Sequence, residues 1–258
     1  MKINITPKQK DYIKEFFLDL PSNLLKIYLY YNKFDKEIRI IGGAVRDLLL
    51  LQTPRDIDLA TNALPTESLF ILHELANDTK SENEIITAKG IRHGTVVITF
   101  SEFEQYEITS IDFDIVIQNN KIVTKTTQQW KEDAYSRDFT INTMSIDFKQ
   151  NVYDYMNAYD DLMNQRIKFV TTNYQEAVIN DPLLILRFFK LMAKFPKPQF
   201  DKEIIYFFRK NIELLSIIKP STMEWFCTNI SHSPYGEYVI NLMNNIGINT
   251  DKYIKTIF

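Results

Sequence analysis

Four residues have side chains and spacing that suit the binding of a metal ion and a phosphate: Asp56, Asp58, Gly42 and Gly43. Asp56 and Asp58 are two apart in a stretch with the pattern of a strand, so their side chains are expected on one face. Adjacent carboxylates repel unless a cation lies between them, and a divalent metal is the usual cation. The glycines precede a helical pattern, where unobstructed backbone N–H groups suit a phosphate. A phosphate site beside paired metal ligands predicts nucleotidyl transfer.

A third carboxylate, Glu107, lies on a later strand, where Tyr106 and Ile108 alternate with it. Glu107 is therefore expected on the face opposite those two residues. Three carboxylates on neighbouring strands can hold two divalent metals about 4 Å apart, which activate an attacking hydroxyl and stabilise a leaving pyrophosphate. The alternative interpretation is a solvated strand edge.

The elements that must position these residues follow from hydrophobic periodicity. Two amphipathic helices come first, and the pattern then predicts a strand at 37–41, a helix at 44–51, a strand at 56–61 and a helix at 65–76. Strands follow at 84–87, 94–100 and 105–110, then a hairpin around Asn119 and Asn120, helices at 128–136 and 138–144, and a short strand at 167–170. From Tyr174 onward the pattern is helical. The fold class is therefore α+β, with a catalytic domain at 1–172 and a helical region at 173–258.

Composition limits the classes of function. The chain has 258 residues and a net charge of −3, so contact with nucleic acid requires a local basic patch. Cys227 is the only cysteine, which excludes an internal disulfide and a multi-cysteine zinc site and fits a reducing cytoplasm. No run reaches the ~18 apolar residues of a membrane span, and the N-terminus lacks the apolar core of a signal peptide. We therefore expect a cytoplasmic protein without a membrane partner.

Five motifs occur in a fixed order: GGAVRD, DIDLAT, GIRHGTV, EITS and RDFTINTMSID. Together they resemble the class II tRNA nucleotidyltransferase and bacterial poly(A) polymerase family, over roughly residues 38–195. The resemblance implies a polymerase-beta-like nucleotidyltransferase head, a mixed sheet with flanking helices, followed by an all-helical neck and body that is short here. It also implies a two-metal Mg²⁺ site, CTP and ATP as substrates, and the 3′ end of tRNA or another RNA as partner.

The resemblance also implies roles for individual residues. Gly42 and Gly43 would hold the triphosphate, Asp56 and Asp58 would bind magnesium, and Glu107 would be the third carboxylate of the active site. The remaining implied nucleotide-binding residues are Arg46, Asp47, Arg137, Asp138 and Asn142, of which Arg137 and Asp138 belong to a segment linked to ribose recognition. Arg92 and His93 would contact RNA or lie near phosphate.

The chain departs from the family where bases are selected. Relatives carry Glu-Asp-x-x-Arg at the start of the neck helices. In this chain Asp181 matches the motif and is implied to bind the nucleotide, whereas Asn180 replaces the glutamate and Leu184 replaces the arginine. Leucine cannot form the bidentate hydrogen bonds of planar base readout. Either Arg187, one helical turn further on, takes that role, or base selection is altered.

These features favour a metal-dependent, template-independent ribonucleotidyltransferase that adds CCA, or part of it, to tRNA 3′ ends. Poly(A) polymerase is the alternative, and an inactive RNA-binding module with the same fold is a second alternative. The helical region is shorter than in full-length relatives, so we expect weaker, salt-sensitive binding of the primer. The sequence indicates no oligomeric state.

Overall fold

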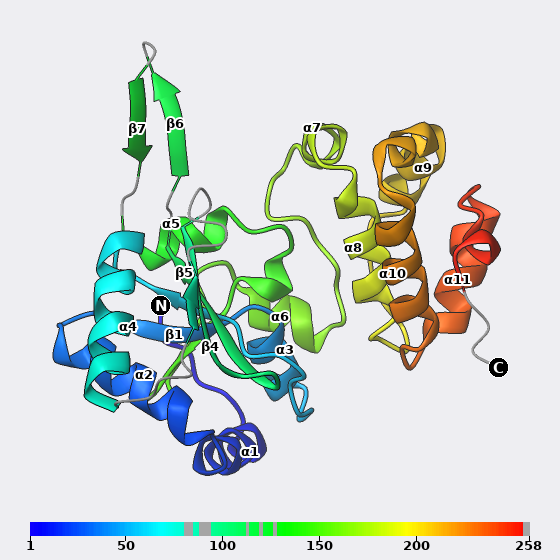
Figure 1. Ribbon diagram of the computed structural model, residues 1–258. Coiled ribbons are helices and arrows are strands. Elements are labelled where there is room, and N and C mark those ends of the chain that lie inside the picture. The colour runs from blue at the N-terminus through cyan, green and yellow to red at the C-terminus, as the bar shows by residue number, and fades with distance from the viewer. Residues whose placement is uncertain (80–84, 88–93, 112–113, 119–120, 126–127, 255–258) are drawn as a thin grey trace. The chain divides into compact units, whose positions relative to one another are not determined.

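The computed structural model describes residues 1–79, 85–87, 94–111, 114–118, 121–125 and 128–254. It divides into two compact units (Figure 1). The first comprises Met1–Arg137 and Ile141–Ala158, and the second comprises Asp138–Thr140 and Tyr159–Phe258. The predicted functional boundary near residue 172 stays a prediction.

The first unit is built on a mixed sheet, as predicted. Among the described residues, seven strands form it in the order β3-β4-β5-β2-β1-β8-β9. The β2–β5 pair is parallel and the other neighbouring strands are antiparallel. The strands are β1 (Ile38–Ile41), β2 (Leu59–Thr61), β3 (Ile85–Thr87), β4 (Thr95–Ser101), β5 (Glu104–Ser110), β8 (Ser145–Asp147) and β9 (Val152–Tyr153). The strands of the predicted hairpin, β6 (Asp114–Gln118) and β7 (Lys121–Lys125), pair as a separate two-stranded sheet, and the turn itself lies outside the described residues.

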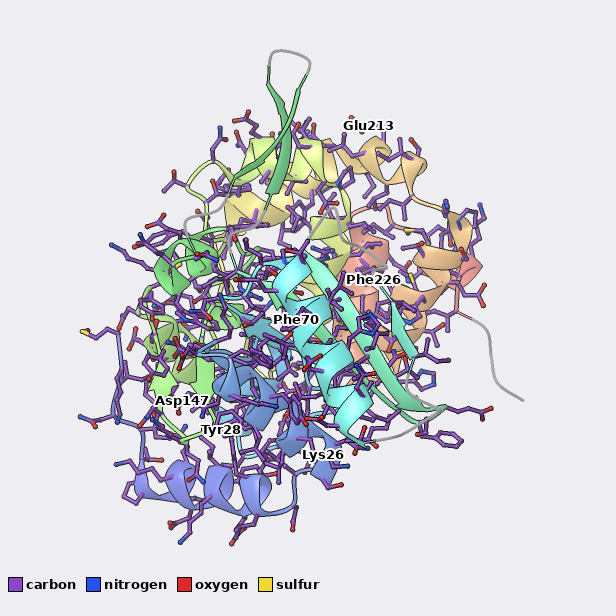
Figure 2. The ribbon with its side chains drawn as sticks, turned by 60° about the vertical axis from the view of Figure 1, so that its left-hand side comes forward. Lys26, Tyr28, Phe70, Asp147, Glu213 and Phe226 are labelled. Carbon is purple, nitrogen blue, oxygen red and sulfur yellow. The ribbon has the colours of Figure 1, made fainter. Side chains whose placement is uncertain are left out.

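Helices flank this sheet. They are α1 (Pro7–Leu18), α2 (Ser22–Lys33), α3 (Gly43–Leu49), α4 (Pro65–Thr79) and α5 (Trp130–Tyr135). A capping box, in which the Thr6 and Gln9 side chains each bond the other's backbone N–H, starts α1. Helices α2 and α4 pack against each other and on the sheet, while Phe70 lies on the exposed side of α4 (Figure 2).

The core of the first unit follows the alternation in the sequence. Ile40, Leu59 and Ile108, on three neighbouring strands, are fully buried. On β5, Tyr106 and Ile108 are buried and Glu107 is exposed, which confirms the predicted faces of that strand.

The second unit is helical from Tyr174 onward apart from an isolated bridge at Gln199, as predicted. Its helices are α6 (Ala158–Met163), α7 (Tyr174–Asn180), α8 (Leu183–Met192), α9 (Lys202–Lys210), η3 (Ile212–Ile217), α10 (Pro220–Ser231), α11 (Gly236–Asn245) and η4 (Thr250–Lys252). Helix α8 packs against α7, α10 and α11, and it buries Phe188 and Phe189 against Phe208 of α9. No helix among the described residues is both long and apolar enough to cross a membrane.

Three predicted elements were wrong in extent or type. The strand expected at 56–61 begins at Leu59, because within this segment only Leu59–Thr61 pair with β1 and β5. Asp56 therefore lies in a bend, and Asp58 lies in the irregular segment between that bend and β2. The helix expected at 138–144 is a single 3-10 turn, η2 (Thr140–Asn142), because Thr140 and Asp138 exchange backbone hydrogen bonds with Lys168 and Val170 instead. Those bonds, with the bridge between Phe139 and Phe169, leave 167–170 as an extended segment rather than a strand.

Candidate functional site

The glycine turn joins β1 to α3. Gly42 has φ +65° and ψ −128°, a backbone conformation that residues with a Cβ rarely adopt. Gly43 is constrained differently, because a Cβ added there would lie 3.3 Å from Nη2 of Arg46. Gly42 is therefore favoured by its backbone conformation, whereas at Gly43 a larger residue would crowd the guanidinium of Arg46.

Arg46 is a buried arginine that links two segments of the first unit. Its Nε and Nη2 lie 3.0 and 2.9 Å from Oδ1 of Asp47, and its Nη1 donates to Oδ1 of Asn142 at 2.8 Å. The structure therefore brings together three residues that were predicted to contribute to nucleotide binding. Asp47 provides the charge that a buried guanidinium requires.

Arg137 lies at the same glycine turn. Its Nε and Nη2 donate to Oδ2 of Asp133, at 3.1 and 2.8 Å, and a Cβ added to Gly42 would lie 4.0 Å from its Nη1. Asp133 is 8% exposed. Sequence reasoning missed this aspartate, although its spacing of four residues from Arg137 was a signal for an ion pair.

Asp56 and Asp58 are exposed; Asp56 lies in the bend with Arg55, and Asp58 directly precedes β2. The backbone carbonyl of Asp58 accepts a hydrogen bond from the N–H of Ile41, the residue that precedes Gly42, at 3.0 Å. The surrounding protein desolvates the Asp58 carboxyl and Asp56 repels it, so its pKa is raised, while Arg137 opposes the shift. The carboxylate pair therefore lies next to the glycine turn and is only partly neutralised.

Glu107 occupies the adjacent position on the neighbouring strand. Leu59 pairs with Ile108 in the parallel register, and Asp58 and Glu107 directly precede those two residues. Neighbouring strands lie about 4.8 Å apart. In the described part of the chain, however, no group of three or more His, Cys, Asp or Glu side chains is arranged to hold a metal ion.

Three predicted residues of the second unit also meet. Nη1 of Arg187 lies 3.8 Å from Oδ2 of Asp138 and 3.9 Å from Oδ2 of Asp181. The Arg187 side chain is 45% exposed. Leu184, by contrast, is 7% exposed and belongs to the helical core, and Asn180 is exposed at the end of α7.

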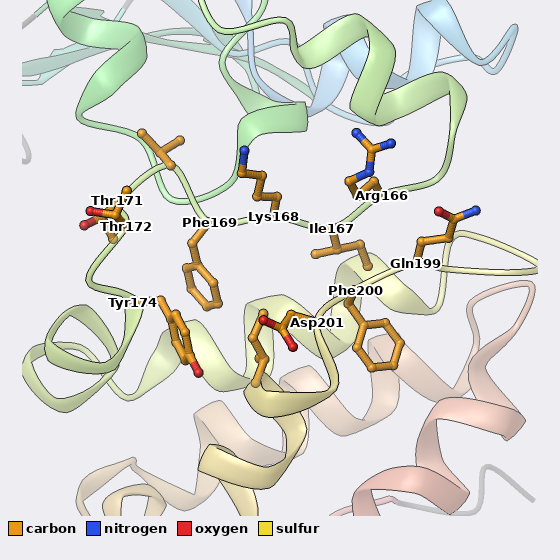
Figure 3. Close-up of a pocket in the computed structure, with 12 residues that line it drawn as sticks. Arg166, Ile167, Lys168, Phe169, Thr171, Thr172, Tyr174, Gln199, Phe200 and Asp201 are labelled. Carbon is orange, nitrogen blue, oxygen red and sulfur yellow. The ribbon is translucent and has the colours of Figure 1, made fainter.

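The second unit also contains a pocket of about 610 Å³. Figure 3 shows the rings of Phe169, Tyr174 and Phe200 around it, together with Lys168 and Asp201. None of the predicted site residues that the structure describes lines this pocket. Arg92 and His93 lie outside the described residues.

Known proteins are similar to this chain in both sequence and fold. A family model described as the poly(A) polymerase head domain matches residues 38–168, half of the chain. The mitochondrial CCA tRNA nucleotidyltransferase 1 of Homo sapiens is 36% identical over 162 residues, covering 63% of this chain and 36% of that protein. Its counterpart from Mus musculus is 31% identical over 84% of this chain and 49% of that protein. The CCA-adding enzyme of Enterococcus faecalis is 33% identical over 58% of this chain and 34% of that enzyme.

Two solved structures show the same fold. The Bacillus stearothermophilus CCA-adding enzyme in complex with CTP has a TM-score of 0.70 at 23% identity, covering 88% of this chain and 52% of that chain. The Thermotoga maritima CCA-adding enzyme, complexed with tRNA, has a TM-score of 0.68 at 19% identity, covering 91% and 54%. This chain thus spans about a third to a half of the length of the proteins it matches. The resemblance and the fold expected from the five motifs are confirmed, and the chain belongs to the family defined by the poly(A) polymerase head domain.

Proposed function

We propose that this chain is a ribonucleotidyltransferase that uses CTP and ATP to add CCA, or part of it, to the 3′ end of tRNA. The observation that carries the proposal is the arrangement at Gly42. The constrained glycine turn, the guanidinium of Arg137 and the carboxylates of Asp56 and Asp58 all lie at the end of β1. Relatives of this chain are named CCA tRNA nucleotidyltransferases and CCA-adding enzymes, which supports the same activity.

The residues at the turn fit a triphosphate. Two arginines, Arg46 and Arg137, place guanidinium groups beside Gly42 and Gly43, and each is oriented by a partly or fully buried aspartate. Oriented guanidinium groups bind phosphate oxygens and hold them in position for an in-line displacement. We propose that Arg137 contacts the triphosphate directly, and that Arg46 supports the turn through Asn142.

The carboxylates fit magnesium. Asp56 and Asp58 supply the oxygen ligands that Mg²⁺ prefers, and their mutual repulsion, which raises the pKa of Asp58, is relieved when a cation lies between them. Glu107 is the further residue proposed for this metal site. When bound there, Mg²⁺ would supply a hydroxyl of lowered pKa at the primer terminus and neutralise charge on the leaving pyrophosphate.

A direct test uses product lengths. The chain is incubated with tRNA that lacks CCA, ends in CC or ends in CCA, with CTP alone, ATP alone or both. Addition that stops at three nucleotides supports CCA synthesis, and an unbounded ladder with ATP supports poly(A) synthesis. Poly(A) synthesis stays the second candidate because Leu184, at the position of the base-reading arginine, is buried and has no polar group to offer a base.

The metal site is tested by Asp58→Asn, with Asp11→Asn on the exposed side of α1 as the matched control. We expect Asp58→Asn to reduce incorporation by at least about 100-fold while tRNA binding persists. Magnesium should raise the unfolding temperature of the wild type and of Asp11→Asn, but not of Asp58→Asn. Full incorporation by Asp58→Asn would refute the assignment, and an inactive wild type that binds tRNA would favour the RNA-binding module.

The location also stays a proposal. The single cysteine supports a reducing compartment such as the cytoplasm. The relatives from Homo sapiens and Mus musculus are named mitochondrial, so a location in the cytoplasm does not follow from the family.

A further inference from the structure

A buried arginine outside the candidate site connects strand β1 to the helix that carries Asp133. Arg39 lies on β1 and its side chain is 5% exposed. Its guanidinium stacks between two aromatic rings, 3.9 Å from the centroid of Trp130 and 3.8 Å from that of Tyr153. A buried charge without such partners would be strongly destabilising, so the surroundings of Arg39 are built to hold it.

A carboxylate closes this arrangement. Oε1 of Glu37 accepts hydrogen bonds from Nε and Nη2 of Arg39, at 2.9 and 2.6 Å, and Oε2 of Glu37 accepts one from Nε1 of Trp130 at 2.8 Å. Nη1 of Arg39 also donates to the hydroxyls of Ser145 and Tyr155, at 3.3 and 3.4 Å. Trp130 is thus held on its face by Arg39 and at its edge by Glu37.

Trp130 is the first residue of α5, which spans only Trp130–Tyr135 and has no side-chain hydrogen bond at its N-cap. Isolated helices this short are not stable in water, so α5 depends on tertiary contacts. Trp130 also packs on the small buried cluster of Ile41, Ala60 and Ile111. One turn further on, Asp133 holds the guanidinium of Arg137.

We propose that Arg39 is a positioning residue for Arg137. It anchors the start of α5 through Trp130, and the anchored helix places Asp133, which in turn places Arg137 beside Gly42. This inference rests on the proposed function, because it assigns Arg39 to the binding of the nucleoside triphosphate. Lysine cannot replace Arg39, since an ammonium group lacks the planar face that stacks between two rings.

The test combines Arg39→Lys and Arg137→Ala in a double-mutant cycle, with the KM for CTP, kcat and the unfolding temperature measured for each variant. Arg39→Lys should raise the KM for CTP about tenfold in the wild-type background. It should leave the KM unchanged in the Arg137→Ala background, because the effect of Arg39 is proposed to act only through Arg137. Arg166→Lys removes an ion-paired arginine of the second unit and is the matched control for a general cost of the exchange.

Each outcome decides a different claim. An equal rise in KM in both backgrounds would overturn the inference, because Arg39 would then act on CTP binding independently of Arg137. An unchanged KM for Arg39→Lys would overturn it as well. The proposed function would fail by a different result, a wild-type chain that binds tRNA but adds no nucleotide to it, and the two failures are distinguished in this way.

Discussion

The glycine turn allows a quantitative prediction, because its two glycines are constrained by different physics. Gly42 has a positive φ, but a Cβ added there would meet Nη1 of Arg137 only at an ordinary contact distance of 4.0 Å. The cost of Gly42→Ala is therefore conformational. A residue forced into such a sparsely populated region costs about 1–3 kcal/mol, and we expect Gly42→Ala to lower the free energy of unfolding of the first unit by that amount.

Gly43 is expected to behave differently. It begins α3, where alanine is favoured over glycine by up to about 1 kcal/mol. A Cβ there would lie 3.3 Å from Nη2 of Arg46, which is tied to Asp47 and Asn142 and moves only by weakening those bonds. The two effects oppose each other, so Gly43→Ala should change the free energy of unfolding by less than about 1 kcal/mol. Gly43→Ala should reduce nucleotide incorporation more than its small effect on stability suggests, because it displaces the guanidinium of Arg46.

The two tryptophans provide the assay. Trp130 belongs to the first unit and Trp225 to the second, and these are the only tryptophans in the chain. In a Trp225→Phe background, fluorescence during urea unfolding reports on the first unit through Trp130. Trp225 is 51% exposed, so this background change should be mild. Equal unfolding free energies for Gly42→Ala and Gly43→Ala would refute the separation of backbone strain from side-chain crowding.

Three further predictions concern the helical unit. Leu184→Arg, which restores the residue found in relatives, should lower the free energy of unfolding by about 1–3 kcal/mol in a urea titration, because it places a charge in the buried core. Arg187→Ala should change the free energy of unfolding by less than about 1 kcal/mol, because the ion pairs of Arg187 are half exposed. The same variant should discriminate less between CTP and ATP in single-nucleotide assays. Burial raises the pKa of Cys227 to about 11, so its thiol should react with a disulfide reagent at pH 8 only after unfolding. The contribution of the neutral thiol to the free energy of unfolding is fully present below pH 9.0, and it should decline as the pH rises toward 11.

Local patterns in the sequence predicted the parts of the site that depend on local geometry. The alternation on β5 placed Glu107 opposite Tyr106 and Ile108, and the two glycines marked a turn before a helix. The extent of β2 was wrong because the residues of this segment that pair with β1 and β5 begin at Leu59. Periodicity within one segment carries no information about where its neighbours begin.

The supporting residues were harder to predict. Asp133 and Arg137 have a spacing that suggests an ion pair, but Arg137 lies beyond the end of α5, where helical spacing no longer fixes a contact. The aromatic partners of Arg39 come from α5 and β9, which are far apart in the sequence, so no local pattern indicates them. Such contacts depend on the complete fold.

Leu184 and Arg187, the two candidate residues for base selection, have different surroundings in the structure. Leu184 is buried and apolar, so it contributes to the core of the second unit and not to recognition. Arg187 is 45% exposed and lies 3.8 and 3.9 Å from two carboxylates, at the outer limit of ion pairing. Half-exposed pairs of this kind contribute at most about 1 kcal/mol, so exchanging one of them for the edge of a base costs little. Asp138 and Asp181 would then hold the guanidinium near a base edge, which a planar arginine can read by bidentate hydrogen bonds. We therefore expect base preference in this chain to depend on Arg187 and to be insensitive to polar substitutions at Leu184.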